Sequence, residues 1–346
     1  MSLLTVCAGL NGFRIGEFGL GTFAVILLCL LVGTSIFISI LYFTLPLTPG
    51  ELCSLGLLLI CSVWAALDGD TMLFSSIIIV VSSYIAVGKW IHQARFFYLY
   101  IFLFPLLIGI LFYIFSVAFP SFVYQAEAGG KYLFLGPLTI LRFEGAVLNA
   151  NAYGIGTAVL MFCITFLGVK RKLNLLGYFT LLLSASYSGI ISLLYLIAVG
   201  RKNFLVKVVC IIAVVAILPT YGLVKGWSIL ESVRIIKYGY YFLNLFQQSL
   251  SSILWGGIER TGHEWVSLSD NAYLTLIYDH GFVYLFTYLL GFAILLRRVA
   301  FLLPIFLILN FIVDLQYFWY ANLMFLLAAR LIFSVTQSRT NTEGIE

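Results

Sequence analysis

FFYLYIFLFPLLIGILFYIFSVA, residues 96–118, contains no charged side chain. A helix needs about 20 apolar residues to cross the hydrocarbon core of a bilayer, so this stretch is long enough for one crossing. Comparable apolar stretches occupy residues 23–44, 51–67, 71–88, 150–169, 203–220, 272–295, 299–314 and 317–335. Residues 173–200 hold a divided stretch that fits two short or broken helices. The expected fold is therefore all-α, a polytopic integral membrane protein with about 11 transmembrane helices.

The composition excludes a water-soluble globular protein. Hydrophobic residues make up 62% of the 346 residues and charged residues only 10%. The net charge of +5 comes from cations in short hydrophilic gaps, which does not indicate nucleic-acid binding. The six cysteines lie in or beside apolar runs, without the paired spacing of a disulfide framework or a thiolate metal site. No repeat or linker divides the chain, so residues 1–346 are interpreted as a single polytopic membrane domain.

Clusters of basic residues predict the side of the membrane that each connection faces, because Lys and Arg next to helix ends are retained on the cytoplasmic side. The clusters are Lys89 with Arg95, residues 170–172, Arg201 with Lys202 and Lys207, and Arg297 with Arg298. If all four are inside, the two long hydrophilic connections, 119–149 and 221–271, face the periplasm or cell exterior. The stretch 173–200 then forms a hairpin with ASYSG (185–189) at its apex. Irregular backbone at that depth is tolerated only where it lines a polar cavity.

The longer outer connection, 221–271, begins with a helical period. Apolar residues recur every three or four positions, at Ile229, Val233, Ile236, Tyr240 and Leu243. The opposite stripe is polar and comprises Glu231, Arg234, Lys237, Tyr241, Asn244 and Gln248. This pattern predicts a periplasmic amphipathic helix at the membrane surface. Its cations either contact lipid head groups or hold a phosphate-bearing substrate; Arg234 is favoured for phosphate because a guanidinium binds phosphate oxygens bidentately.

The end of the same connection contributes three further candidate residues. WGGIERTGH (255–263) is turn-like and contains Arg260 and His263. Asp270 stands in SLSDN, where the chain re-enters the membrane. An Asp at this place ordinarily caps the helix that follows. Alternatively, Asp270 accepts a proton from an attacking hydroxyl, and the two roles are compatible.

The shorter outer connection ends in LRFEGAVLNANAYG (141–154), which places Arg142 beside Asn149 and Asn151 at the mouth of the next span. Polar side chains at a helix mouth in the membrane cost free energy unless they find partners. One alternative is structural: the asparagines cap the helix and Arg142 extends toward lipid head groups. In the other, the three residues form part of a polar site.

Two other polar patterns receive structural interpretations. Asp68-Gly69-Asp70 resembles the paired-acid metal motif of many glycosyltransferases, but it has no third acid nearby in the sequence, so a simple turn is favoured. His280 falls one or two turns inside a span, where a neutral histidine bonded to a neighbouring helix is expected. Neither pattern is included in the predicted site, and no metal is assigned.

Four segments, in their order along the chain, resemble elements of the Wzy-type O-antigen and capsular repeat-unit polymerases and of the related O-antigen ligases. LNANAYG (148–154) resembles the family's Asn-Pro-Asn-x-x-Gly element, although Ala150 replaces the usual proline. It follows an Arg-x-x-Gly step that begins at Arg142. SASYSG (184–189) resembles the apex between two short helices, with Tyr187 where many relatives carry arginine.

The third and fourth segments follow the amphipathic helix. ILWGGIERTG (253–262) resembles the loop glycines after the family's external helix. SDNAYLTLIYDHGFVYLFTYLLGF (269–292) is similar to the closing segment. The ligases typically place a histidine before the asparagine of that segment, whereas Asp270 precedes Asn271 here. This difference favours a polymerase over a ligase.

The resemblance implies a GT-C-like fold in the bacterial inner membrane and transfer of a glycan from undecaprenyl pyrophosphate to a sugar hydroxyl of an incoming lipid-linked repeat unit. The implied reaction is an inverting, metal-independent transfer at the periplasmic face, without a cofactor. It needs cations for the departing pyrophosphate and a base for the acceptor hydroxyl. The expected pyrophosphate ligands are Arg142, Arg234 and Arg260, the base is Asp270 with His263 as second candidate, and the site-shaping residues are Asn149, Asn151 and Tyr273.

Two other functions remain open. An O-antigen ligase would use the same fold and donor but transfer the glycan to lipid A core. A lipid-linked oligosaccharide flippase would be expected to show ionisable residues within spans and internal pseudo-symmetry, and the sequence favours neither feature. The expected partners are undecaprenyl-pyrophosphate-linked oligosaccharides, membrane lipids and a chain-length regulator protein, without nucleic acid.

Overall fold

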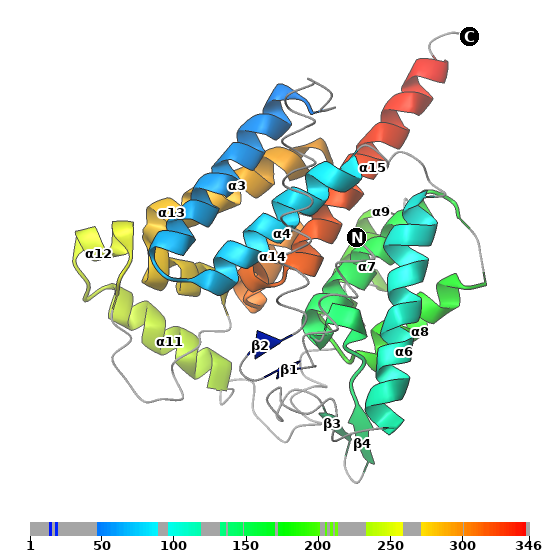
Figure 1. The fold of residues 1–346 in the computed structure, drawn as a ribbon, viewed down its shortest axis with the longest axis horizontal. Helices are drawn as coiled ribbons and strands as arrows, with labels where there is room; N and C mark the ends of the chain where they lie inside the picture. Colours follow the sequence, from blue (N-terminus) through cyan, green and yellow to red (C-terminus); the bar gives the residue numbers. More distant parts are fainter. Residues whose placement is uncertain are drawn as a thin grey trace. The chain divides into compact units, whose positions relative to one another are not determined.

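The computed structural model describes residues 14–15, 18–19, 47–88, 96–118, 132–135, 138–147, 149–169, 172–200, 233–258, 271–299 and 301–343, with a few single positions between 205 and 213. Helices dominate these residues (Figure 1). The α-helices are α3 (Pro49–Leu67), α4 (Thr71–Gly88), α6 (Phe104–Ala118), α7 (Ala150–Phe166), α8 (Asn174–Leu183), α9 (Tyr187–Gly200), α11 (Val233–Leu245), α12 (Leu250–Trp255), α13 (Ala272–Leu296), α14 (Leu302–Ile312) and α15 (Trp319–Glu343). The expected span at 23–44, and most of the one at 203–220, lie outside the described residues.

Short elements accompany these helices. The π-helix η2 (Phe97–Leu103) leads into α6, and the 3-10 turns are η3 (Gly145–Val147), η6 (Arg297–Val299) and η7 (Leu315–Tyr317). Two antiparallel pairs are formed by β1 (Arg14–Ile15) with β2 (Phe18–Gly19), and by β3 (Tyr132–Leu135) with β4 (Leu138–Leu141). The β3–β4 hairpin lies in the first predicted outer connection.

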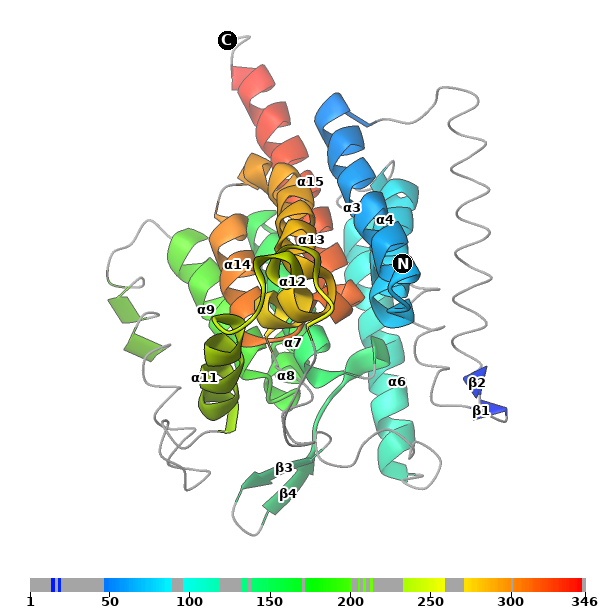
Figure 2. The ribbon, with the colours of Figure 1, turned by 90° about the vertical axis from the view of Figure 1, so that its left-hand side faces the viewer.

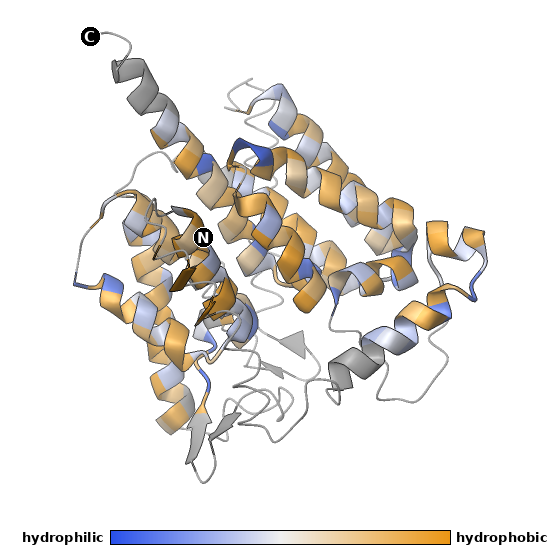
Figure 3. Ribbon diagram, turned by 180° about the vertical axis from the view of Figure 1, so that it is seen from behind, coloured by the Kyte–Doolittle hydropathy of each residue, from blue (hydrophilic) through white to orange (hydrophobic). Residues whose placement is uncertain are grey.

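Several helices can span a membrane. Among the described residues, four are long and apolar enough: Pro49–Leu67, Phe97–Phe115, Ala272–Val299 and Trp319–Thr336. Hydrophobic residues predominate along the helices (Figure 3). Many large apolar side chains face outward, as Leu111 and Phe286 do with 65% and 60% exposure. An outward apolar surface on long helices is what contact with lipid requires, so the chain is a membrane protein.

The chain forms two compact units, each assembled from separated segments. Unit 1 comprises Met1–Pro46, Ser82–Leu193 and Leu323–Glu346, and unit 2 comprises Leu47–Val81 and Leu194–Asn322. In unit 1, α7 packs against α8, and α6 packs against η3. The divided stretch forms the two expected short helices, because α8 ends at Leu183 and α9 begins at Tyr187.

In unit 2, α3 and α13 pack along each other in opposite directions. At one end, Arg298 Nη1 lies 3.1 Å from Glu51 Oε1, and Glu51 also completes a capping box with Thr48 at the start of α3. At the other end, Asp68 follows α3 and contacts His280 on α13. Since Arg298 belongs to a predicted inside cluster, the charge rule predicts that the Asp68 end of unit 2 faces the outer side.

Candidate functional site

The first candidate site, the Arg142 cluster, lies in unit 1 where the chain enters α7. The Arg142 guanidinium donates from Nε to the Ser184 carbonyl oxygen at 2.9 Å, and from Nη2 to the Ala185 carbonyl oxygen at 3.4 Å. Nη2 also lies 3.3 Å from Asn151 Oδ1. These bonds, rather than an extension toward lipid head groups, hold the half-buried arginine. Arg142 therefore joins the beginning of α7 to the apex between α8 and α9.

The two asparagines have separate roles. Asn149 is the N-cap of α7, and its Oδ1 accepts from the backbone N–H groups of Asn151 and Ala152 at 3.0 and 2.9 Å. The capping interpretation is thus confirmed for Asn149. The Asn151 side chain instead contacts Arg142, so it adds a polar partner at the helix mouth.

Serines fill the irregular apex. Ser184, Ser186 and Ser188 are all buried. Ser186 Oγ accepts from the Gly189 N–H at 3.1 Å, and it lies 3.1 Å from Ser188 Oγ. Ala185 has a φ of +47°, in the left-handed region. The hydroxyls and Arg142 provide polar partners for the backbone of the apex from within the protein.

A close backbone contact joins the first two family-like segments. A Cβ added at Gly189 would lie 2.6 Å from the Gly154 carbonyl carbon. One added at Gly154 would lie 2.4 Å from Ser186 Cβ. Any larger residue at either position would force α7 away from the start of α9. Gly154 of LNANAYG and Gly189 of SASYSG are therefore both required by the contact between α7 and the start of α9.

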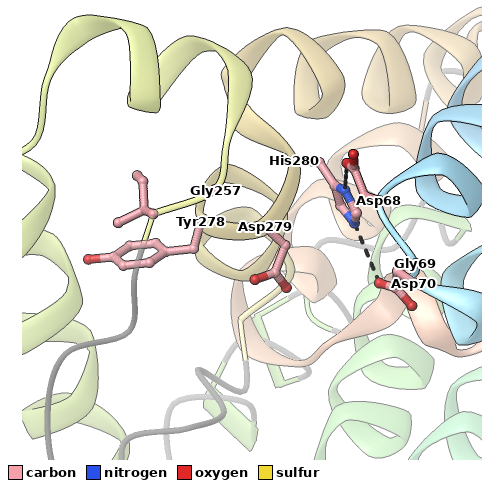
Figure 4. Close-up of a pocket in the computed structure, with 8 residues that line it drawn as sticks. Asp68, Gly69, Asp70, Gly257, Tyr278, Asp279 and His280 are labelled. Carbon is pink, nitrogen blue, oxygen red and sulfur yellow. Dashed lines mark hydrogen bonds and ion pairs between the residues drawn. The ribbon is translucent and has the colours of Figure 1, made fainter.

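The second candidate site, the His280 cavity, lies in unit 2. His280 is 1% exposed, and Figure 4 shows its ring between two aspartates. Its Nδ1 is 2.6 Å from Asp68 Oδ2 and its Nε2 is 3.4 Å from Asp70 Oδ2. The Tyr317 hydroxyl donates to the same Asp70 oxygen at 3.1 Å. The sequence predicts a bond from His280 to a neighbouring helix, and the structure places that bond at the turn joining α3 to α4.

A break in α13 positions His280. Gly281, the next residue, has φ +88° and ψ 169°, which no other residue type adopts without strain. A Cβ on Gly281 would lie 2.3 Å from the Leu254 carbonyl oxygen, and one on Gly256 would lie 2.5 Å from the His280 carbonyl carbon. The end of α12 thus passes directly against the broken turn of α13.

Backbone hydrogen bonds continue this crossing. The Gly257 N–H donates to the Asp279 carbonyl at 3.3 Å, and the Ile258 N–H donates to the Tyr278 carbonyl at 3.0 Å. The chain after α12 therefore pairs with the turn of α13 that precedes the break at Gly281. The third and fourth family-like segments meet here, as the first and second do in unit 1.

A cavity of about 350 Å³ lies beside His280. It is lined by Asp68, Gly69, Asp70, Gly257, Ile258, Tyr278, Asp279 and His280. Three carboxylates and one imidazole line it, so their combined charge is negative even with the imidazole protonated. Among the residues that the structure describes, no group of His, Cys, Asp and Glu is arranged to hold a metal ion.

Asp70 is tied into the fold by both of its oxygens. Oδ1 accepts from the Leu73 N–H at 2.9 Å, which caps α4, while Oδ2 faces His280 and Tyr317. Burial acts to raise the pKa of Asp70, but the hydrogen bonds from His280, Leu73 and Tyr317 outweigh it and hold that pKa below its usual value. Burial and the Asp70 carboxylate raise the pKa of Tyr317, so its hydroxyl keeps the proton that it donates.

The remaining predicted site residues are placed only in part. Arg234 lies on α11, with its side chain outside the described residues. Residues 259–270 also lie outside the described residues, and they include Arg260, His263 and Asp270. Tyr273 belongs to unit 2, where its hydroxyl donates to the Leu307 carbonyl at 2.8 Å. Of the predicted set, the structure brings together Arg142, Asn149 and Asn151.

The N-cap of α13 is Asn271, whose Oδ1 accepts from the Leu274 N–H at 3.2 Å. The capping role considered for Asp270 thus belongs to its neighbour. Asn and Asp are equally good caps, which is why SLSDN does not distinguish them.

The amphipathic helix α11 forms, but a different stripe faces the protein. Tyr241, assigned to the polar stripe, is buried and packs edge-on against Tyr278 with ring centroids 5.0 Å apart. The Tyr278 hydroxyl donates to the Tyr241 carbonyl at 2.7 Å. Leu243, assigned to the apolar stripe, is exposed. Figure 2 shows α11 and α12 beside α13, the helix that Tyr241 contacts.

The His280 cavity is not part of the site that the sequence predicts. Its residues are separated by about 210 positions, so no local spacing joins them. One signal was available: Asp68-Gly69-Asp70 and Asp279-His280 both interrupt apolar runs, where ionisable side chains are costly without partners.

The chain matches no protein-family model, no curated protein sequence and no solved structure in the comparisons.

Proposed function

We propose that the chain is a membrane glycosyltransferase that joins undecaprenyl-pyrophosphate-linked oligosaccharide repeat units into O antigen or capsule. In this proposal it has about 11 crossings of GT-C-like arrangement in the bacterial inner membrane, with its site on the periplasmic face. The observation that carries the proposal is the pairing of the four family-like segments. The first contacts the second through Gly154 and Gly189, and the third contacts the fourth through Gly256 and Gly281. If each segment resembled the family only by chance, there would be no reason to expect these contacts.

The chemistry suits a site made of fixed side chains. A glycosyl pyrophosphate is already activated, so the protein has to stabilise the departing negative charge and orient the acceptor hydroxyl. Arg142, held by the Ser184 and Ala185 carbonyls, is the proposed pyrophosphate ligand in unit 1. Arg234 and Arg260 are proposed as further ligands. Asp270 is the proposed base of an inverting transfer.

The test uses a strain that lacks the gene and displays its surface polysaccharide on a gel. For a polymerase, single repeat units attached to lipid A core are expected in place of long chains. For an O-antigen ligase, long chains persist but stay unattached to lipid A core. Long attached chains in the deletion strain would refute both functions.

A flippase for lipid-linked oligosaccharides is the second candidate, and one observation favours it. His280 is an ionisable side chain buried within a membrane-spanning helix and bonded to two aspartates, a feature that marks transport pathways as well as enzyme sites. Glycosidic bond formation by the purified protein distinguishes the polymerase from this transporter, because a flippase forms no bond.

A further inference from the structure

The His280 cavity selects its ligand by charge. Asp68, Asp70 and Asp279 surround one imidazole, so an anionic group such as pyrophosphate is repelled. Carboxylate oxygens accept hydrogen bonds, and a ligand with many donors is therefore favoured. The cavity volume of about 350 Å³ falls within the range of small-molecule sites, roughly 300–1,000 Å³.

We propose that the His280 cavity binds an uncharged sugar residue through the carboxylates of Asp68 and Asp279. The role of this sugar rests on the proposed function, in which it is the acceptor end of the incoming repeat unit.

The three carboxylates differ in what they can offer a ligand. The Asp70 side chain is only 19% exposed. Its Oδ1 accepts from the Leu73 N–H, and its Oδ2 faces His280 and Tyr317. The Asp68 side chain is 37% exposed and meets the imidazole through Oδ2, which leaves Oδ1 for a sugar hydroxyl. Asp279 lines the same cavity from the broken turn of α13 (Figure 4).

His280 acts as a positioning residue. Its Nδ1, 2.6 Å from Asp68 Oδ2, fixes the rotamer of that carboxylate, and its Nε2 faces Asp70 on the other side. The ring is itself held against Tyr284, with ring centroids 4.6 Å apart. An asparagine at position 280 could reproduce the Nδ1 donor, whereas a leucine could not.

The probes are methyl glucoside and methyl N-acetylglucosaminide as neutral sugars, glucosamine as a cation and glucuronate as an anion. Saturation-transfer NMR with the full chain in detergent micelles measures their binding. We expect both neutral glycosides to bind and glucuronate not to bind. Asp68→Asn and Asp279→Asn should each weaken binding by about tenfold, since a hydrogen bond to a charged group is lost. His280→Leu should abolish binding, and His280→Asn should restore it.

The matched control is Glu51→Gln, the same carboxylate-to-amide change at the opposite end of α3, and it should bind the glycosides like the wild type. Thermal unfolding identifies any variant that fails to fold. The proposal would be overturned if glucosamine were the only probe that bound. It would also be overturned if the neutral glycosides still bound to both Asp68→Asn and Asp279→Asn. Asp68-dependent sugar binding without glycan lengthening would refute the polymerase function and leave the site standing. Lengthening at the wild-type rate by Asp68→Asn would refute the acceptor role alone.

Discussion

Arg142 and His280 each bond to residues far away along the chain. The Arg142 contact to Ser184 spans 42 positions, and the His280 contact to Asp68 spans 212. Arg142 could be picked out from the sequence because its Asn neighbours and the Arg-x-x-Gly step are local. His280 could not be assigned partners, since each of its contacts depends on the packing of α3 against α13.

Replacing Arg142 tests its role as a pyrophosphate ligand. Arg142→Ala should reduce glycan lengthening by about ten- to a hundredfold, the effect of losing one or two charge-assisted hydrogen bonds. Arg142→Lys should recover little of it, because an ammonium lacks the planar fork that reaches both apex carbonyls. Arg298→Lys, at the Glu51 end of unit 2, is the control. Normal polysaccharide length with Arg142→Ala, at equal protein level, would remove Arg142 from the site.

The ionisation of Asp70 makes the stability of the fold depend on pH. Its pKa in the folded state is below the unfolded value of about 3.9, so the ionised form favours folding. This contribution is present above the unfolded pKa and is lost as the pH falls through the folded pKa. Asn at position 70 still caps α4 but does not titrate in this range. The unfolding temperature, followed by tryptophan fluorescence, should therefore fall less between pH 5 and pH 3 in Asp70→Asn; equal slopes would contradict the assigned pKa shift.

At the scale of elements, apolar length was a sufficient guide to most of the helices. The stretches at 51–67, 71–88 and 272–295 became α3, α4 and α13, and 173–200 became two short helices, α8 and α9. The break in α13 was not predictable, because Gly281 stands in an apolar run where a glycine equally well indicates close helix packing. The side of α11 that faces the protein was predicted wrongly, because tyrosine occurs on either face of an amphipathic helix.

The Gly281 break can be tested by adding one methyl group. Gly281→Ala should lower the free energy of unfolding by about 2–4 kcal/mol, since its Cβ meets the Leu254 carbonyl oxygen at a positive φ. Gly239→Ala is the matched control: on α11 nothing lies within 4 Å of the added Cβ, and alanine favours a helix over glycine by about 0.5–1 kcal/mol. Thermal unfolding of the two variants should move in opposite directions. Equal unfolding temperatures would refute the close crossing.

At the scale of the whole molecule, the charge rule predicts an orientation for unit 2. Arg298 bonds Glu51 at one end of the α3–α13 pair, and Asp68 bonds His280 at the other. Basic residues therefore mark one end and the acidic cavity the other. The count of crossings remains a prediction from the sequence.

Cysteine labelling tests the orientation of unit 2. Leu67, 82% exposed at the predicted outer end of α3, and Arg297, exposed at the predicted inner end of α13, are suitable positions. In cells with a permeabilised outer membrane, an impermeant maleimide should label Leu67→Cys and spare Arg297→Cys, each compared with the wild type. Labelling of Arg297→Cys alone would invert the predicted topology.

The central claim is that this chain forms glycosidic bonds between lipid-linked repeat units. The most direct measurement reconstitutes the purified full chain in proteoliposomes with undecaprenyl-pyrophosphate-linked repeat units from its own strain and follows product length by mass spectrometry. We expect products lengthened by whole repeat units, and strongly reduced amounts of them with Arg142→Ala. Repeat units that stay single in the presence of the folded wild-type protein would contradict it.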